Sequence, residues 1–235
     1  MATDGNYKAR DWDSQPAYIY PDYKSTPLRG PTKPLVPLKQ TLSELTGPVF
    51  GDDAVRALDD DLTKNNAKSG EVLGERIVVC GRVMDEDGRP VPNTLLEIWQ
   101  ANAAGRYAHE VDQHDAPLDP NFLGAGRAVT DADGLYRFTT IKPGAYPWPN
   151  HANAWRPAHI HYSLFGPSYL TRLVTQMYFP GDPLLDLDPI YQSAPPGARE
   201  LLVAEFSLDR TEADFALGYI FDIVLRGRNA TPMEG

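Results

Sequence analysis

Two histidines separated by a single residue are the first candidates for chemistry in this chain. His159 and His161 lie in the apolar stretch 158–165, which is predicted to form a β-strand. Alternate side chains of a strand point to the same face, so both imidazoles face one way, about 6.5–7 Å apart along the backbone. Two imidazoles at that spacing can bind one metal ion. A pair of purely structural histidines fits this short pattern equally well.

Longer motifs around these histidines are more specific. They are residues 97–107 (Glu-Ile-Trp-Gln-Ala-Asn-Ala-Ala-Gly-Arg-Tyr), 142–148 (Lys-Pro-Gly-Ala-Tyr-Pro-Trp) and 155–161 (Trp-Arg-Pro-Ala-His-Ile-His). From Gly74 onward, these motifs and the Phe-Asp-Ile-Val-Leu-Arg-Gly of 221–227 resemble the intradiol ring-cleavage dioxygenases. The segment before Gly74, with Pro-Asp-Tyr-Lys at 21–24, is similar to the N-terminal arm of β subunits in the αβ members of that family.

The resemblance implies a non-haem Fe(III) site with four protein ligands, Tyr107, Tyr146, His159 and His161. The donor types suit that ion, because phenolate oxygen is a hard anionic ligand and imidazole also binds iron. A free tyrosine has a pKa of about 10, and a trivalent cation beside the oxygen would lower that pKa sharply. Sites for Fe(II) and oxygen typically use two histidines and one carboxylate instead. Tyr146 is also expected to leave the metal when a catechol binds.

The resemblance further implies the substrates and the residues around them. The expected reaction is the cleavage of protocatechuate by O2 between its two hydroxyl-bearing carbons, which gives 3-carboxy-cis,cis-muconate. Arg156 is expected to stabilise the negative charge that develops on the ring. Trp148, Gln176 and Ile190 are expected to line the pocket, and Tyr23 is expected to reach the carboxylate side of the substrate. A homologous α subunit is the expected partner and would supply part of the carboxylate pocket.

Other interpretations of these residues stay open. A cupin-like metal site also begins with His-x-His but needs a further histidine downstream, and no histidine follows His161. His109 and His114 are interpreted as solvated loop residues, and His151 as peripheral. Within the family, catechol, hydroxyquinol or another substituted catechol is an alternative substrate. Outside it, the pattern of turns within 81–138 is also typical of prealbumin-like modules that bind other molecules without catalysing a reaction.

The composition indicates a folded, acidic protein. The chain has 235 residues, of which 42% are hydrophobic, and a formal net charge of -10, so neither nucleic acid nor an anionic membrane is an expected partner. The single cysteine, Cys80, cannot form an internal disulfide and is expected to pack as a small buried hydrophobic residue. No run approaches the length of a membrane span and the first twenty residues lack the apolar region of a signal peptide, which predicts a cytoplasmic protein.

The predicted fold class is all-β, a prealbumin-like β-sandwich with long active-site loops. The expected strands are 76–84, 94–100, 128–131, 135–140, 158–165, 172–179, 202–208 and 218–225. A short helix is expected at 52–62 and a helical turn within 183–192. Many prolines predict that residues 1–70 form an extended arm followed by that short helix, an interaction segment on the body or on a partner subunit. Residues 71–235 are expected to form the catalytic domain.

Overall fold

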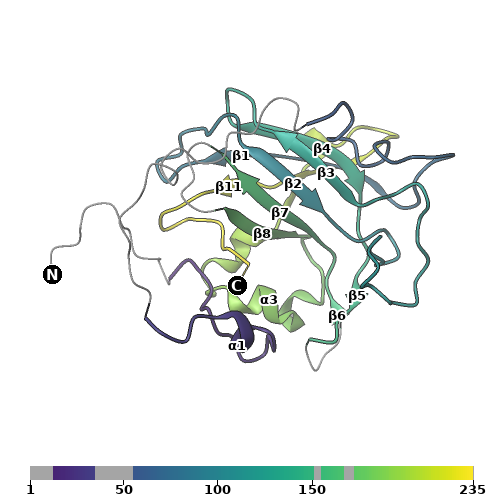
Figure 1. Ribbon diagram of the computed structural model, residues 1–235. Helices are drawn as coiled ribbons and strands as arrows, with labels where there is room; N and C mark the ends of the chain where they lie inside the picture. The colour runs from purple at the N-terminus through teal and green to yellow at the C-terminus, as the bar shows by residue number, and fades with distance from the viewer. Residues whose placement is uncertain (1–12, 35–54, 151–154, 167–171, 235) are drawn as a thin grey trace.

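Two β-sheets face each other across one apolar core and form a β-sandwich (Figure 1). The computed structural model describes residues 13–34, 55–150, 155–166 and 172–234. The expected all-β sandwich is confirmed. Among the helices of these residues, none has the length and apolarity needed to cross a bilayer. The cytoplasmic location stays a prediction.

The first sheet is organised around its longest strand, β1 (Arg76–Met84). Its other strands are β4 (Leu135–Ile141), β10 (Leu217–Ile220), β11 (Ile223–Val224) and β9 (Glu205–Phe206). β4 pairs antiparallel with β1, whereas β10 and β11 pair parallel with it. Every second side chain of a strand points to the same face, and Ile77, Val79 and Val83 of β1 are fully buried in the core for that reason.

The second sheet carries the histidine strand at an inner position. Its strand order is β3 (Ala125–Val129), β2 (Leu95–Trp99), β7 (His159–Phe165) and β8 (Leu173–Tyr178), all antiparallel. Ile160, Tyr162 and Leu164 of β7 are fully buried in the core between the sheets. His159 and His161 alternate with them and are also buried, on the opposite face. β7 is therefore covered on both faces, by the core on one side and by the candidate site on the other.

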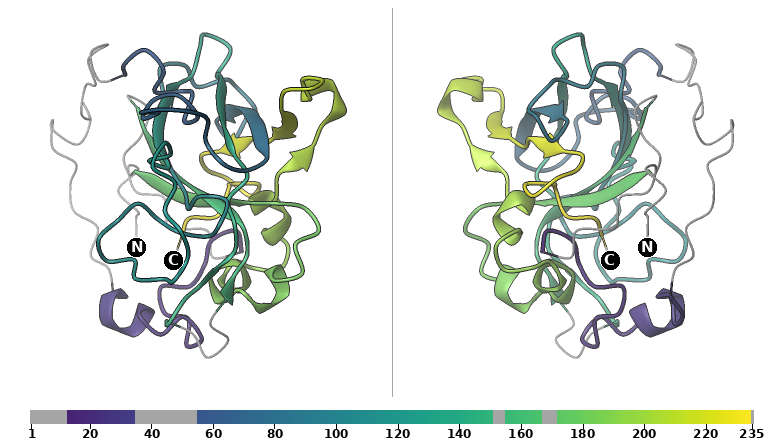
Figure 2. Two further views of the ribbon diagram at one scale, coloured as in Figure 1. Left: turned by 90° about the vertical axis from the view of Figure 1, so that its right-hand side faces the viewer. Right: turned by 90° about the vertical axis from the view of Figure 1, so that its left-hand side faces the viewer.

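Loops, short helices and the arm cover that second face. A two-stranded ribbon of β5 (Tyr146–Pro147) and β6 (Trp155–Arg156) lies at one end, and η2 (Leu185–Leu187) and α3 (Pro189–Ser193) follow β8. Figures 1 and 2 show α1 (Thr26–Arg29) of the arm and α3 at the same end of the molecule, beside the last described residues. Two stretches far apart in sequence, the arm and the C-terminal residues 230–234, thus lie next to the histidine strand.

Most expected strands are confirmed to within a few residues at their ends, but two are wrong. Segment 202–208 holds only the two residues of β9, between η3 (Arg199–Leu202) and η4 (Leu208–Arg210), because Leu202 is buried beside α3 instead. The strand expected at 218–225 is divided into β10 and β11. Asp222 Oδ1 accepts the backbone N–H of Arg82 at 2.8 Å, so a side chain replaces the backbone partner at the break.

One expectation about the residues before β1 is also wrong. Within 52–62, the described residues form turns rather than a helix, because Leu62 is fully buried and its N–H donates to Thr139 O of β4 at 2.8 Å. The arm contains one helical turn, α1, at Thr26–Arg29. Proline suits the first turn of a helix, and Thr26 Oγ1 donates to Tyr23 O at 2.9 Å.

Candidate active site

Neighbouring strands of the second sheet place the site residues in two rows. Trp99 of β2, His161 of β7 and Gln176 of β8 are register partners. His159 and Tyr178 are partners in the next row on the same face. The Trp99 ring stacks on the His161 imidazole with 4.8 Å between ring centroids and 3° between planes. Strands β2 and β8 thus flank both imidazoles, and the ring edges that point away from the sheet face the loops.

The two histidines converge through their Nε2 atoms, which lie 3.2 Å apart. His159 Nδ1 donates to Pro157 O at 2.7 Å, so the ring proton is on Nδ1 and the lone pair is on Nε2. Burial, followed by the charge of Arg156 and the neighbouring His161, holds the pKa of His159 well below its usual value. His159 is therefore neutral near pH 7 and has a lone pair available for a metal ion.

The two predicted tyrosine ligands lie beside the histidines. Tyr146 Oη is 3.4 Å from His159 Nε2, and the Tyr107 ring meets the Tyr146 ring edge-on with 5.3 Å between centroids. Tyr107 Oη is buried and has no hydrogen-bond partner among the described residues. Burial, followed by the nearby Tyr146, raises the pKa of Tyr107 well above its usual value. A bound cation would give this oxygen the partner it lacks, so the four donors fit a metal ion.

Two glycines let the loops that carry these tyrosines touch. Gly105 has φ +78°, and a Cβ there would lie 2.1 Å from Ala145 O, directly before Tyr146. Gly144 is equally close to the other loop, because a Cβ there would lie 2.5 Å from Ala103 O. These are the glycines of the Asn-x-x-Gly-x-Tyr and Lys-Pro-Gly-x-Tyr motifs. The close backbone contact explains why each motif has a glycine, and not a residue with a Cβ, at this position.

Replacing Gly105 with alanine is expected to displace the two tyrosines and to lower the free energy of unfolding by about 1–3 kcal/mol from overpacking, beyond the cost of its left-handed backbone. Gly181 is the matched control, because it has φ +74° but open space around the missing Cβ. Urea unfolding and metal content would be measured for both alanine variants. Equal losses of stability and of metal content in the Gly105→Ala and Gly181→Ala variants would show that the contact with Ala145 does not contribute to either quantity.

Arg156 connects the histidines to α3. It is only 2% exposed and makes a bidentate pair with fully buried Asp188, with Nε–Oδ1 at 3.1 Å and Nη2–Oδ2 at 2.8 Å. Nη2 also donates to Gln176 Oε1 at 2.6 Å and to Tyr178 Oη at 2.9 Å. Burial opposes its charge, but Tyr178, Asp188 and Tyr146 outweigh burial and raise the pKa of Arg156 well above its usual value. A permanent cation is therefore fixed in the site.

The other end of this guanidinium faces the candidate metal ligands. Arg156 Nη1 lies 3.0 Å from His159 Nε2 and 3.4 Å from Tyr146 Oη. Its position follows from the register of the small ribbon, in which Arg156 is the partner of Tyr146. The cation can therefore interact with anionic groups that bind next to the two side chains.

The arm reaches the same place. The rings of Tyr23 and Trp148 meet edge-on with 5.2 Å between centroids, and the Arg156 guanidinium lies 5.4 Å from the Trp148 ring. Asn150 Nδ2 donates to Ser25 Oγ at 3.0 Å and ties the arm to the loop after Trp148. Burial, followed by Glu234, raises the pKa of Tyr23, so its hydroxyl stays a neutral hydrogen-bond donor.

The structure brings the remaining predicted pocket residues to the other side of Arg156. Gln176 and Ile190 are buried and border a small cavity together with Tyr178. The other three histidines are not expected to take part in the site. His109 is exposed, as expected. His114 is half-buried rather than solvated, because its ring meets Trp155 edge-on, and His151 lies outside the described residues.

Sequence reasoning missed three residues of the site, Asp188, Tyr178 and Glu234. Asp188 precedes Pro189 at the start of α3, a pattern that predicts a helix start but not a partner for a buried arginine. Glu234 Oε2 lies 3.6 Å from His161 Nδ1. Burial alone would raise the pKa of Glu234, but His161, the Gln176 amide and Arg156 outweigh it and hold that pKa at about 2.

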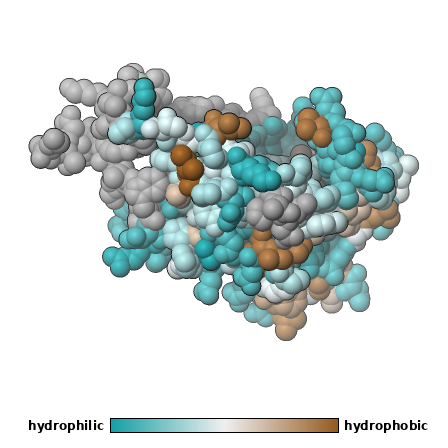
Figure 3. All heavy atoms as spheres, turned by 90° about the horizontal axis from the view of Figure 1, so that it is seen from below, coloured by the Kyte–Doolittle hydropathy of each residue, from teal (hydrophilic) through white to brown (hydrophobic). Residues whose placement is uncertain are grey.

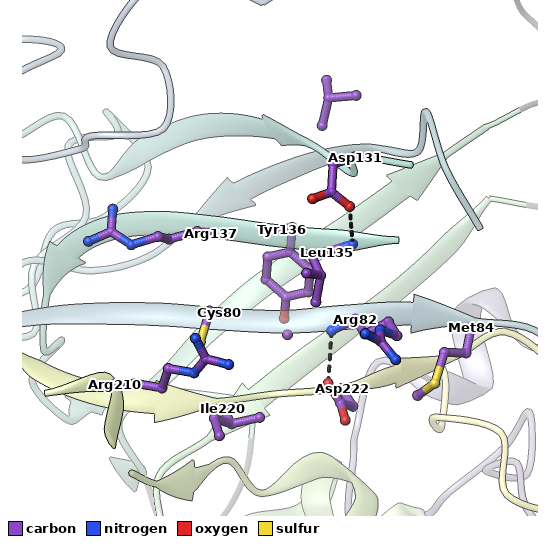
Figure 4. A pocket seen from close by; sticks show the side chains of 12 residues that line it. Cys80, Arg82, Met84, Asp131, Leu135, Tyr136, Arg137, Arg210, Ile220 and Asp222 are labelled. Carbon is purple, nitrogen blue, oxygen red and sulfur yellow. Dashed lines mark hydrogen bonds between the residues drawn. The ribbon is translucent and has the colours of Figure 1, made fainter. Parts of the chain in front are cut away.

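A surface pocket lies elsewhere in the molecule. It has a volume of about 480 Å³ and lies on the outer face of the first sheet, where Arg137 of β4 and Arg210 lie on either side of Cys80 (Figure 4). None of the predicted site residues borders it. Cys80 is half-buried there rather than buried as expected, because its side chain points away from the core. Burial raises the pKa of its thiol, although Arg210 and Arg137 oppose that effect.

Comparisons with known proteins agree with this fold and identify the family. A family described as "Dioxygenase" matches residues 45–227. The chain belongs to the intradiol ring-cleavage dioxygenases, and the resemblance expected from the sequence is confirmed. Residues 9–41 match a second, narrower family, "Protocatechuate 3,4-dioxygenase beta subunit N terminal".

Individual relatives differ in how much of the chain they share. The chain is 68% identical to the protocatechuate 3,4-dioxygenase beta chain of Burkholderia cepacia, over 96% of each protein. It is 32% identical to a hydroxyquinol 1,2-dioxygenase of Rhizobium sp., over 64% of this chain and 53% of that protein. The crystal structure of 3-chlorocatechol 1,2-dioxygenase from Rhodococcus opacus 1CP has a TM-score of 0.57 and 26% identity, over 76% of this chain and 69% of the other.

Proposed function

We propose that this chain is the iron-binding β-type subunit of an enzyme that cleaves protocatechuate with O2 to 3-carboxy-cis,cis-muconate. The observation that carries this proposal is the 68% identity, over 96% of both chains, to a protocatechuate 3,4-dioxygenase beta chain. Catechol and hydroxyquinol are the alternative substrates within the family. The hydroxyquinol relative supports that alternative less well, since this chain covers only 53% of it.

The proposed metal is non-haem Fe(III), held by Tyr107, Tyr146, His159 and His161. The convergent Nε2 atoms and the unpartnered Tyr107 oxygen support this set. Among the described residues, no three side chains of His, Cys, Asp or Glu gather closely enough to hold a metal ion, so tyrosines are needed to complete a site here. When bound, Fe(III) supplies Lewis-acid chemistry that draws electron density from a catechol.

The proposed roles of the surrounding residues follow from their contacts. Arg156, fixed by Asp188, keeps a positive charge next to the ligands and stabilises negative charge on the substrate ring. Its Nη1 also faces the Tyr146 oxygen and would stabilise negative charge on that oxygen. Tyr23 stays protonated and donates a hydrogen bond toward the substrate carboxylate. Trp148, Gln176 and Ile190 shape the pocket.

The proposed partner is a homologous α subunit, because the similar Burkholderia cepacia protein is a beta chain. We assign residues 1–70 to the interaction segment and 71–235 to the catalytic domain. Seen from below, the end of the molecule that carries α1 and α3 shows apolar patches between hydrophilic areas (Figure 3). A partner subunit that covers this end would close the carboxylate side of the pocket next to Tyr23.

The visible spectrum of the purified protein, produced with and without an α chain, tests this proposal. Iron-loaded protein is expected to be red-brown from tyrosinate bound to Fe(III), and its band is expected to shift on anaerobic addition of protocatechuate. Catechol and hydroxyquinol are the comparison ligands, and after O2 is admitted, ring cleavage is expected to be faster with protocatechuate than with either of them. A colourless protein that retains iron would contradict the tyrosinate site. Faster cleavage of hydroxyquinol would favour the alternative substrate.

A further inference from the structure

His161 has a buried nitrogen that the proposed metal site does not use. If Nε2 binds the metal, the ring proton is on Nδ1, which must then donate. This Nδ1 is buried without a hydrogen-bond partner among the described residues, whereas Nδ1 of His159 donates to Pro157 O at 2.7 Å. One predicted ligand is therefore fixed through its second nitrogen and the other is not.

The nearest acceptor for that nitrogen is a carboxylate from a distant part of the chain. Glu234 Oε2 lies 3.6 Å from His161 Nδ1, and both side chains are largely buried, with 17% and 11% of their surface exposed. Gln176 Nε2 is a second buried donor without a partner in the described part of the chain, and Gln176 borders the same small cavity as Glu234. An ionised carboxylate has two oxygens that can accept from more than one donor, and a movement of less than about 1 Å would bring Oε2 within hydrogen-bond distance of His161 Nδ1.

Backbone contacts hold this glutamate in place from two sides. Glu234 N donates to Val174 O of β8 at 2.8 Å, and Thr175 Oγ1 donates to Pro232 O at 2.7 Å. From the arm, Gln15 Oε1 accepts the N–H of Met233 at 2.8 Å. The arm therefore clamps the segment that carries the carboxylate against the strand next to β7.

We propose that Glu234 is a positioning residue for His161, and that Gln15 of the arm keeps it there. The carboxylate accepts the Nδ1 proton, fixes the orientation and tautomer of the ring, and makes Nε2 a stronger donor to the metal. Carboxylate–histidine–metal arrangements of this kind raise the basicity of the ligand. This inference rests on the proposed function, because it needs a metal at His161.

Replacing Glu234 with glutamine tests the charge at constant size, and Glu205→Gln on the exposed strand β9 is the matched control. The E234Q variant is expected to lose about 10–100-fold in iron affinity, measured by competition with a chelator. The visible band of the fraction that stays loaded is expected to move to longer wavelength, because a weaker histidine donor leaves Fe(III) more electron-poor. If Glu234 had only a structural role, its substitution would change the stability of the fold but not the wavelength of this band.

A second variant and the wild-type protein separate a failure of this inference from a failure of the proposed function. Gln15→Ala leaves the carboxylate in the chain but releases the segment that holds it, and is expected to give a smaller shift in the same direction. Unchanged iron affinity and band position in both E234Q and Q15A, with a coloured wild-type protein, would overturn this inference alone. A colourless wild-type protein that holds iron would overturn the proposed function and this inference with it.

Discussion

Replacing Arg156 with serine is expected to lower the turnover of protocatechuate by about 100–1000-fold, the usual effect of removing one preorganised electrostatic group from an active site. Iron content is expected to change much less, because Arg156 is not a proposed ligand. The free energy of unfolding is expected to fall by about 3–5 kcal/mol, since Asp188 would be left buried without its counter-charge. Steady-state kinetics, iron analysis and urea unfolding would measure the three quantities.

A second substitution separates the two effects of this change. Adding Asp188→Asn to Arg156→Ser removes the unpaired charge and keeps a side chain that can begin α3, so stability should return in part while turnover stays low. Arg137→Ser is the control, because Arg137 is exposed on the far sheet and pairs with Glu212. Recovery of full turnover in the double variant would exclude a direct role of Arg156.

Replacing Tyr107 with phenylalanine is expected to have opposite effects on the iron-loaded and the metal-free protein. The loaded protein should hold iron at least about 10-fold less tightly and lose part of its visible band, because one of its two phenolates is gone. The metal-free protein should become more stable by about 1–3 kcal/mol, because the buried Tyr107 oxygen has no partner among the described residues. Unfolding with and without iron would be compared.

Tyr136→Phe is the matched control for this prediction. Tyr136 is also buried, but its hydroxyl donates to Phe221 O at 2.5 Å in the core between the sheets. Its removal should lower stability by about 1 kcal/mol in both states and leave the colour unchanged. If Tyr107→Phe behaved like this control, with the same iron content as the wild type, Tyr107 would not be a ligand.

The parts of the site that follow from local pattern could be predicted from the sequence. The period-two alternation of β7 placed His159 and His161 on one face, and the structure has them there. The choice of Tyr107 and Tyr146 came from the resemblance to a family, because no spacing rule connects those loops to β7. Their contact depends on Gly105 and Gly144, whose backbone approach is visible only in three dimensions.

The residues that support the site could not be predicted, because each is paired with a residue far away in the chain. Asp188 lies 32 residues after Arg156, and nothing in the sequence Leu-Asp-Leu-Asp-Pro marks one aspartate as buried. Glu234 follows a turn-rich segment and has no periodic pattern around it. Local rules also failed at Asp222, where a side chain replaces a backbone partner and ends a strand early.

The parallel pairing of β1 with β10 has a consequence for the order of events during synthesis. β1 emerges early from the ribosome, but the residues that pair beside it come about 140 positions later, as in the contact of Arg82 with Asp222. Contacts that distant make folding slow and leave an unpaired strand edge in the nascent chain. Glu234 follows later still, so its proposed contact with His161 can form only after the strands of both sheets have been synthesised.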